Sequence, residues 1–488
     1  MKFHFWPKLF FILFILNFFS YCTSKSEDIP VDIEVNYFVW KGLNAYYLWQ
    51  SDIPELADLR FSNQTDLNAF LYGFASPEIL FEDLLNKPTD RFSRIFDDYI
   101  ALENSKQGIT LNNGMEFGLV ENADNSGNVF GYVRYIVPNS DAAIKGIKRG
   151  QLFNTVDGTQ LDTNNYINLL FSNNTTYTIG FANYNNGNPI TNGNSETLVK
   201  IEIQENPIAI SKVITDGSKK IGYLMYNQFS STFDGELNEA FSGFKSENIN
   251  DLIIDLRYNS GGSVKSATYL GSMVTGQFYN ELFSKESWNE KVQDAFNPTS
   301  FINNFTNQLL NTNSNGNIIL NEAIHSLSLN RVYFIVTKST ASASELVINS
   351  LSSYINVHLI GTRTIGKQVG SITLYDSDNY RRNGINLNQN HTFALQPLVF
   401  EIFNNDNENQ PNGFLPGTTL PGIELSEDYN NLGILGERSD PLLDRTLIYI
   451  STGSKTNRKT FKNKLLNEFY NSNLAKPIKD NMFVDLKK

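Results

Sequence analysis

The sequence of 488 residues contains very little cysteine and histidine: Cys22 is the only cysteine, and there are four histidines. A single cysteine excludes disulfide bonds within the chain, zinc ribbons and a cysteine-dependent catalytic centre. The histidines are scattered and lack the spacing typical of metal ligands. They are His4, His325, His358 and His391. We therefore expect neither a metal site nor a cofactor.

Positive charge is also scarce. The 39 Lys and Arg residues are outnumbered by 51 Asp and Glu residues, which gives a net charge of −12. No basic stripe runs along any segment, which argues against nucleic acid or an anionic membrane surface as the main partner. The apolar fraction of 41% is ample for packed cores and argues against disorder.

After the first twenty residues, no uncharged hydrophobic run is long enough to span a membrane. At the N-terminus, Lys2 and Lys8 accompany the apolar run Leu9–Phe19, the layout of an export signal. Cys22 follows directly, and this arrangement resembles a bacterial lipoprotein signal. It implies removal of residues 1–21, which would change the net charge to −14, and a lipid on Cys22. An ordinary signal peptide and an uncleaved anchor remain alternatives.

The remaining chain is too long for one hydrophobic core, so two or three domains are expected. Residues 22–105 are predicted to form the lipid-anchored N-terminus and a small helical domain, because apolar residues recur there at helical spacing. The aromatic residues of this region are expected to form its core. The predicted helices span Val35–Leu48, Leu67–Phe74 and Glu78–Leu85.

Residues 106–205 contain short β-type runs separated by Gly and Asn turns, among them Met115–Val120 and Gly131–Val137. With a short helix of small residues after the second run, this order resembles a PDZ domain. The resemblance implies that backbone amides near Phe117, Gly118 and Leu119 bind the terminal carboxylate of a peptide, which joins the sheet as an extra strand. A β-rich spacer without a ligand is the alternative.

Residues 206–455 alternate between strand and helix patterns, which is typical of an α/β domain with a covered sheet. The C-terminal tail, residues 456–488, is predicted to be helical, mainly over Thr460–Tyr470. The predicted strands are Lys220–Tyr226, Leu252–Leu256, Val332–Val336 and Val357–Ile360, and the predicted helices are Phe233–Phe244, Ser344–Tyr354 and Pro441–Ile450.

Three short segments follow strands of this region, at the ends where open α/β sheets place their sites. The first, Asp255–Gly262, ends in two glycines that leave backbone N–H groups open to a ligand. The second, Ser339–Glu345, joins a strand to a helix, where free amides favour negative charge. The third, Thr364–Lys367, is a turn with a lysine. Singly, each has an ordinary explanation: a turn, a capping box of Ser342 and Glu345, and a solvated surface lysine.

Together, the three segments closely resemble the carboxyl-terminal processing, or tail-specific, serine proteases. That family combines a signal or anchor, a helical region, a PDZ domain and a crotonase/ClpP-like α/β protease domain in this order. Its lysine lies twenty-five residues after the nucleophilic serine, as Lys367 does after Ser342. This spacing selects Ser342 over Ser339 and Ser344, and the resemblance covers Val35–Ile450.

The resemblance implies Ser342 as the nucleophile and Lys367 as the general base. A lysine must be neutral to take a proton, so its pKa has to fall from roughly 10.4 by about three units. Burial away from carboxylates is the expected cause of the lower pKa. Glu345 matches a family position near the pair and is assigned a supporting role.

Further residues complete the predicted site. The amide of Ala343, with an amide of Gly261 or Gly262, is implied to form the oxyanion hole. Ser371 stands where many family members carry a Gln that orients the lysine. Its hydroxyl can accept a hydrogen bond from the amine but reaches less far, and Gln368 lies nearby.

The leading hypothesis is a serine endopeptidase of the bacterial cell envelope, exported and lipid-anchored, that cuts proteins after recognising their C-terminal tails. One alternative is a catalytically weak or inactive peptide- or ligand-binding lipoprotein on the same scaffold. A structural or carbohydrate-handling lipoprotein is the other alternative, suggested by loops rich in Asn and Tyr, but no paired carboxylates typical of glycan hydrolysis accompany them.

Overall fold

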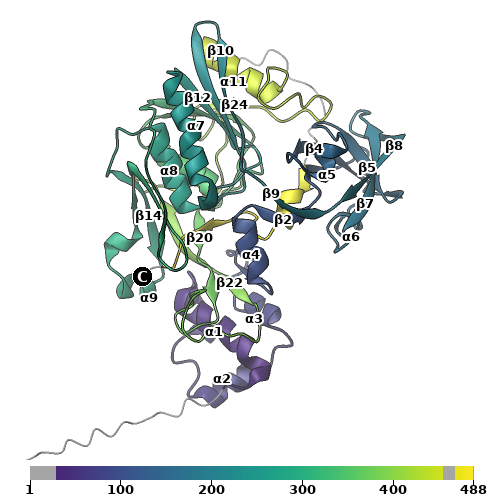
Figure 1. Ribbon diagram of the computed structural model, residues 1–488. Coiled ribbons are helices and arrows are strands. Elements are labelled where there is room, and N and C mark those ends of the chain that lie inside the picture. Colours follow the sequence, from purple (N-terminus) through teal and green to yellow (C-terminus); the bar gives the residue numbers. More distant parts are fainter. Residues whose placement is uncertain (1–28, 454–465, 467, 487–488) are drawn as a thin grey trace, which may run out of the picture.

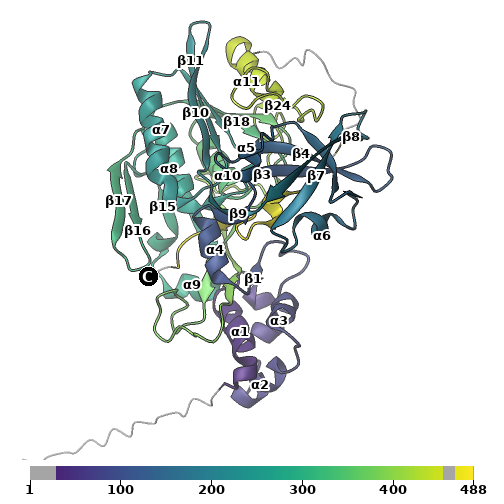
Figure 2. The same cartoon turned by 45° about the vertical axis from the view of Figure 1, so that its right-hand side comes forward.

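The computed structural model describes residues 29–453, 466 and 468–486. The predicted signal sequence, residues 1–21, and Cys22 lie outside the described residues. Within the described part, no helix is both long and apolar enough to cross a lipid bilayer. Figures 1 and 2 show a helical region at one end of the molecule, and a β-rich domain beside an α/β domain at the other.

The N-terminal region is helical, as predicted. Ser76 caps its third helix by accepting the N–H of Ile79, and Pro77 at the first helical position favours the same start. Phe38 and Tyr47 are fully buried, so the aromatic residues of this region form its core, as expected. The helices are α1 (Glu34–Tyr46), α2 (Gln64–Leu71) and α3 (Pro77–Asp83), followed by β1 (Arg94–Phe96) and α4 (Tyr99–Lys106).

The β-rich domain is an antiparallel sheet with the strand order β25-β3-β4-β5-β7-β8, in which β25 comes from the C-terminal end of the chain. A two-stranded ribbon of β2 (Ile109–Asn112) and β9 (Ile201–Gln204) connects this domain to the rest. The other elements are β3 (Met115–Glu121), β4 (Val129–Ile136), α5 (Asp141–Ile144), β5 (Leu152–Val156), β6 (Thr159–Gln160), α6 (Tyr166–Leu170), β7 (Thr176–Asn183) and β8 (Ile190–Val199).

The α/β domain contains a six-stranded sheet in the order β10-β11-β12-β18-β19-β24, in which every pair after β10-β11 is parallel. Both faces are covered, because neighbouring residues of β11 join different cores: Tyr223 clusters with Leu447 of α11, and Leu224 with Phe241 of α7. The elements are β10 (Ile208–Asp216), β11 (Lys219–Tyr226), α7 (Asp234–Ser246), β12 (Asp251–Asp255), α8 (Val264–Val274), β18 (Arg331–Val336), α10 (Ala343–Ser352), β19 (Asn356–Gly361), β24 (Gly422–Glu424) and α11 (Pro441–Thr452).

A second sheet packs below the first, in the order β13-β26-β20-β23-β14-β15. Its strand β26 again comes from the C-terminal end and lies between β13 and β20. The elements of this layer and its surroundings are β13 (Gly262–Ser263), β14 (Leu282–Trp288), α9 (Glu290–Ala295), β15 (Ile302–Asn304), the hairpin of β16 (Gln308–Thr312) and β17 (Ile318–Ala323), β20 (Val369–Ser371), β21 (Leu374–Tyr375), β22 (Ala394–Gln396) and β23 (Leu398–Phe403).

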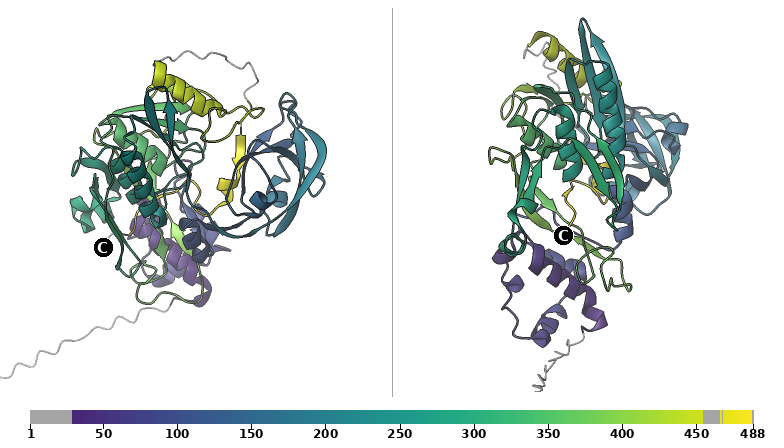
Figure 3. Two further views of the ribbon diagram at one scale, coloured as in Figure 1. Left: turned by 45° about the horizontal axis from the view of Figure 1, so that its top comes forward. Right: turned by 60° about the vertical axis from the view of Figure 1, so that its left-hand side comes forward.

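The C-terminal segment differs from the predicted helical tail. Its described residues contain β25 (Glu468–Asn471), a single short 3-10 helix (Ser472–Ala475), a turn over 477–480 and β26 (Met482–Phe483). The predicted helix over Thr460–Tyr470 is therefore wrong at its described end. Both strands form tertiary hydrogen bonds with edges of existing sheets, and such pairing overrides a local helical pattern. Figure 3 (left) shows the yellow C-terminal strand running beside the blue β-rich domain.

Candidate active site at the strand ends

Ser342 lies at the junction of β18 and α10, with a φ of +66° in the left-handed region. A residue other than glycine keeps this conformation only where its surroundings enforce it. Here the loop is fixed to the neighbouring strand end, because Thr340 Oγ1 donates to the carbonyl of Leu256 at 2.8 Å. The Ser342 side chain is fully buried, and its Oγ makes no hydrogen bond within the described residues. The hydroxyl is thus free to meet a bound group.

Glu345, in the first turn of α10, joins the serine loop to the lysine loop. Its buried carboxylate accepts the N–H groups of Ser342 and Lys367, both at 2.9 Å, and that of Gly366 at 2.7 Å. The hydroxyl of Thr364 also donates to it, at 2.5 Å. Burial raises the pKa of Glu345, and these donors oppose the rise. One carboxylate therefore sets the separation of the two loops.

Lys367 follows β19 and is 2% exposed. Its Nζ donates to the backbone carbonyl of Asp480 at 2.6 Å and lies 5.2 Å from the centre of the Phe92 ring. Burial, with a smaller contribution from Arg94, lowers the pKa of Lys367 to about 7, although Asp480, Asp90 and Glu345 oppose the fall. The direction and the main cause agree with the requirement derived from the sequence.

No hydrogen bond joins Ser342 Oγ to Lys367 Nζ in the described structure. The lysine amine contacts the carbonyl of Asp480 instead, and the two loops are linked through Glu345. Direct contact between serine and lysine therefore requires the amine to leave this carbonyl or to share it.

The two glycines after β12 differ in their hydrogen bonds. The N–H of Gly261 donates to Asn259 Oδ1 at 2.9 Å, whereas the N–H of Gly262 donates to the carbonyl of Asn481 at 2.5 Å. A Cβ at Gly261 would lie 2.3 Å from that carbonyl oxygen, 2.6 Å from Ser342 Cβ and 3.1 Å from the amide nitrogen of Ala343. The amide of Gly261 is thus bonded within its own loop, whereas that of Gly262 is bonded to the C-terminal segment beside Ser342.

Ser371 lies on β20, but its Oγ donates to Asn481 Oδ1 at 3.0 Å and contacts the Met482 carbonyl at 3.2 Å. No hydrogen bond to Lys367 is present, so the lysine-orienting contact expected from the sequence is not formed. Gln368 is buried, and its side-chain amide has no partner within the described residues.

The other serines of the loop have structural contacts. Ser344 Oγ donates to the carbonyl of Asn259 at 3.1 Å. Ser339 Oγ accepts a hydrogen bond from Arg134 Nη2 of the β-rich domain at 2.8 Å. Both hydroxyls are therefore engaged with the protein, whereas that of Ser342 has no partner among the described residues.

Phe117, Gly118 and Leu119 lie on β3, at the edge that receives β25 from the C-terminal segment. The register pairs Gly118 with Asn471 and Leu119 with Tyr470, and the N–H of Phe117 donates to Ser472 Oγ at 3.0 Å. The predicted peptide-binding edge is therefore occupied by the chain itself.

Sequence reasoning missed the contribution of Asp480, Asn481 and Met482 to this site. The nearest signal is the apolar run Met482-Phe483-Val484 between polar residues, which is typical of a short buried strand. Nothing in its local pattern specifies the strand with which it pairs. Among the described residues, no group of three or more His, Cys, Asp or Glu side chains has the arrangement of a metal site.

Comparison with known proteins identifies the regions that build this site. Residues 220–388, which include both glycines, Ser342 and Lys367, match peptidase family S41, and residues 34–94 match the peptidase S41 N-terminal domain. Two regions of the chain, together less than half of its length, are thus similar to this family. The α/β domain is accordingly that of a serine peptidase, a class of hydrolase, in agreement with the resemblance seen in the sequence.

The chain is also similar to curated proteins described as probable CtpA-like serine proteases. It is 25% identical over 178 residues to one from Staphylococcus epidermidis, which covers 36% of this chain and 31% of that protein. It is 24% identical over 185 residues to one from Staphylococcus aureus, which covers 38% of this chain and 32% of that protein. The chain thus spans about a third of the length of these relatives.

Among solved structures, the chain resembles a candidate S41 protease from Bacteroides fragilis NCTC 9343. The TM-score is 0.64 at 24% identity, over 86% of this chain and 97% of that chain. A likeness at this identity establishes a shared fold, and the multidomain α/β architecture predicted from the sequence is confirmed at that level.

Proposed function

We propose that this protein is an endopeptidase that hydrolyses peptide bonds in proteins, with Ser342 as nucleophile and Lys367 as general base. The observation that carries the proposal is the burial of Lys367 in a loop tied by Glu345 to the serine loop. Burial is the main reason that the pKa of Lys367 falls to about 7. A lysine with this pKa is largely neutral in weakly alkaline solution, as a general base must be.

The reaction follows from the positions of these groups. Neutral Lys367 removes the proton of Ser342 Oγ as the oxygen attacks the substrate carbonyl. The N–H groups of Gly262 and Ala343 stabilise the oxyanion that forms. Lys367 then returns the proton to the departing amine, and water hydrolyses the resulting ester by the same sequence of proton transfers.

Substrate selection is assigned to the β-rich domain, which we interpret as PDZ-like, beside a crotonase/ClpP-like peptidase domain. Its strand β3 already accepts an added strand, β25, and this is the mode by which such domains bind peptide ends. An extended substrate tail would take the same edge. The test is a disordered substrate with its C-terminal carboxylate amidated, for which we expect slower cleavage than for the free acid; equal rates contradict tail recognition.

We further propose a position in the bacterial cell envelope, exported and held to the membrane by a lipid on Cys22. The support is the sequence alone: Lys2 and Lys8, the apolar run Leu9–Phe19 and the single cysteine directly after it. Metabolic labelling with a fatty acid, compared between the wild type and Cys22→Ala, tests the anchor. A label that persists in the variant contradicts it.

The peptidase proposal is tested with Ser342→Ala and Lys367→Ala in a casein degradation assay. We expect each variant to lose at least about 10³-fold in rate, because either loss removes the activated nucleophile. Ser352→Ala is the matched control, since its hydroxyl caps the end of the same helix and donates to the carbonyl of Asn349. Undiminished cleavage by either site variant contradicts the proposed pair.

A peptide-binding protein on the same scaffold is the second candidate. The observation that favours it is the missing hydrogen bond between Ser342 Oγ and Lys367 Nζ. A fluorophosphonate or comparable serine-directed probe separates the two functions. Labelling of the wild type and not of Ser342→Ala supports the peptidase; no labelling of either, with tight peptide binding, supports the binding protein.

A further inference from the structure

The segment Ile478–Val484 occupies a position between β13 and β20 that an extended peptide would fill. Its strand β26 is parallel to both neighbours, with Met482 opposite Gly262 and Phe483 opposite Ser371. The N–H of Val484 continues the ladder by donating to the carbonyl of Ser371 at 3.2 Å. A strand added between two edges in this way is held by its backbone, which is how peptidases and peptide-binding domains commonly hold extended ligands.

The register of this segment places one peptide bond at the candidate nucleophile. The carbonyl of Asn481 accepts the N–H of Gly262 at 2.5 Å and shares with Ser342 Cβ the space beside Gly261. The preceding carbonyl, that of Asp480, accepts Lys367 Nζ. Asp480 has a φ of +43°, a left-handed conformation that bends the chain just before this bond.

The side chains on either side of this bond lie in two different environments. Asn481 is 5% exposed: its Nδ2 donates to Gln396 Oε1 at 2.8 Å, and its Oδ1 accepts Ser371 Oγ. A carboxamide satisfies both partners because it combines a donor with an acceptor. Ser371 thereby gains a role different from the lysine-orienting one expected from the sequence.

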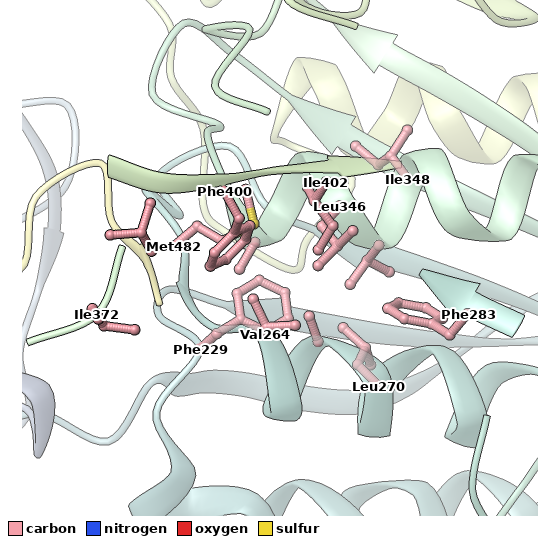
Figure 4. Close-up of a cluster of buried hydrophobic side chains, with 14 of the residues drawn as sticks. Phe229, Val264, Leu270, Phe283, Leu346, Ile348, Ile372, Phe400, Ile402 and Met482 are labelled. Atoms are coloured by element: carbon pink, nitrogen blue, oxygen red, sulfur yellow. The ribbon is translucent and has the colours of Figure 1, made fainter. Parts of the chain in front are cut away.

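Met482, after the bond, is fully buried. Figure 4 shows its side chain beside Ile372, Phe229 and Phe400, in the cluster that includes Val264. A flexible unbranched side chain suits such an irregular apolar site.

The C-terminal segment is also bound at residues that precede Ile478. Ser472 Oγ accepts a hydrogen bond from the N–H of Phe117, and Lys476 pairs with the buried Glu116 at 2.8 Å. The C-terminal segment thus contacts the peptide-binding edge of the β-rich domain and the strand ends of the α/β domain in turn.

We propose that the C-terminal segment is the enzyme's own first substrate and that Ser342 cleaves the Asn481–Met482 bond. This inference rests on the proposed function. Ser342 Oγ forms an ester with the Asn481 carbonyl carbon, and its proton passes through Lys367 to the amine of Met482. The Asn481–Met482 bond breaks, residues 482–488 depart, and water hydrolyses the ester to leave a C-terminal Asn481.

The environments of Asn481 and Met482 define which residues another protein must carry on either side of the bond to be cut. The residue before the cut bond carries a carboxamide that fits Ser371 and Gln396, and the residue after it carries an unbranched apolar side chain. The residues after the cut bond are extended, since β13 and β20 bind the backbone of Met482 and Phe483, and the chain turns at Asp480 before it.

Intact-mass spectrometry of the full-length protein tests self-cleavage. At pH 8 we expect the wild type to lose residues 482–488 and to end at Asn481, and Ser342→Ala to keep them. We also expect the full-length and the trimmed wild-type protein each to cut a synthetic peptide of residues 476–486 between its Asn and its Met. Trimming at another bond, or trimming that persists in Ser342→Ala, overturns the proposal.

Casein degradation by the same samples separates this proposal from the proposed function. A wild type that degrades casein while residues 482–488 stay attached overturns self-cleavage and leaves the peptidase function intact. A wild type that does neither overturns both.

A second variant tests the register without altering the nucleophile. Met482→Asp places a charge in the apolar pocket, so we expect at least tenfold slower trimming. Asp485→Asn is the matched control, because Asp485 is exposed, and it should be trimmed at the wild-type rate. Equal trimming of Met482→Asp and the wild type overturns the assigned register.

Discussion

At the scale of the residue, Lys367 shows what the sequence can and cannot specify. The requirement for a neutral lysine, and burial as its cause, followed from the chemistry expected for Ser342. The groups around the amine did not, because the Asp480 carbonyl and the Phe92 ring are more than a hundred residues away. Sequence patterns report local structure, whereas the environment of a buried charge is built by distant segments.

The depressed pKa of Lys367 predicts a rising pH profile for hydrolysis. The amine acts when deprotonated, and its pKa is about 7. We expect kcat/KM for a peptide substrate to rise about tenfold per pH unit below 7 and to level off above it. Thermal unfolding of the enzyme over the same range serves as the control for loss of folded protein. A rate that keeps rising to pH 10 would contradict a buried, depressed lysine.

At the scale of the element, Glu345 connects the start of α10 to the turn after β19. Sequence alone could assign the capping half of this arrangement, since Ser342 and Glu345 have capping-box spacing. It could not reveal that Thr364, Gly366 and Lys367 donate to the same carboxylate. Those donors lie in the turn after β19, a neighbouring parallel strand whose adjacency to β18 is a tertiary property.

Replacing this carboxylate tests its positioning role. Glu345→Gln presents an amide N–H₂ to backbone donors, so we expect kcat to fall by about 10- to 100-fold and unfolding stability by about 2 kcal/mol. KM should change less than threefold, because the substrate does not contact Glu345. Glu345→Asp, which keeps the charge but shortens the reach, should retain more stability than Glu345→Gln. A variant with normal kcat would show that the two loops keep their separation without this carboxylate.

The pairing of β25 with β3 provides a second test at this scale. Ser472→Ala removes the acceptor of the Phe117 N–H and a partner of Glu116. We expect hydrogen exchange in β3 to become about tenfold faster, as loss of one hydrogen bond of about 1.4 kcal/mol implies. Ser451→Ala on the exposed face of α11 should leave this exchange unchanged. Unaltered exchange in Ser472→Ala would mean that the remaining ladder alone protects the edge.

The strands and helices themselves agree closely with the sequence prediction. β11, β12, β18 and β19 begin and end within one residue of the predicted bounds, because buried parallel strands are continuous apolar runs. The prediction fails where a segment gains its structure only from partners, as β25 and β26 do.

At the scale of the whole molecule, buried charges join the β-rich and α/β domains next to the site. Arg149 pairs with Glu427 at 2.9 Å, and Glu427 also contacts Arg257, which binds Asp255 and Asp440 at 2.6 and 2.7 Å. Arg134 links β4 to the serine loop. The Arg257 cluster adjoins the Gly261–Gly262 loop, so this loop and the junction of the two domains share the same support.

Glu427 makes this junction sensitive to acid. Burial tends to raise its pKa, but Arg149 and Arg257 outweigh burial and lower the pKa to about 2, below the usual 4.5. The ionised carboxylate of Glu427 therefore stabilises the folded state by about 3 kcal/mol above pH 4.5. This stabilisation is lost as the pH falls toward 2.

We therefore expect Glu427→Gln to be less stable than the wild type by about 3 kcal/mol at pH 7, with the gap closing as the pH approaches 2. Denaturant unfolding at several pH values measures this difference in unfolding free energy. Glu437→Gln, at an exposed pair with Lys212, is the control and should unfold like the wild type. A stability difference that stays constant with pH would show that Glu427→Gln destabilises the fold through packing and not through charge.

The insertion of β26 between β13 and β20 has a kinetic consequence. A competitor tethered to its own enzyme acts at an effective concentration in the millimolar range, as short linkers generally do. The apparent KM of an external substrate is then multiplied by the reciprocal of the fraction of molecules in which β26 has left its place between β13 and β20. Freshly synthesised enzyme should accordingly show a lag in its progress curves, and the length of that lag is independent of enzyme concentration because the competition is intramolecular.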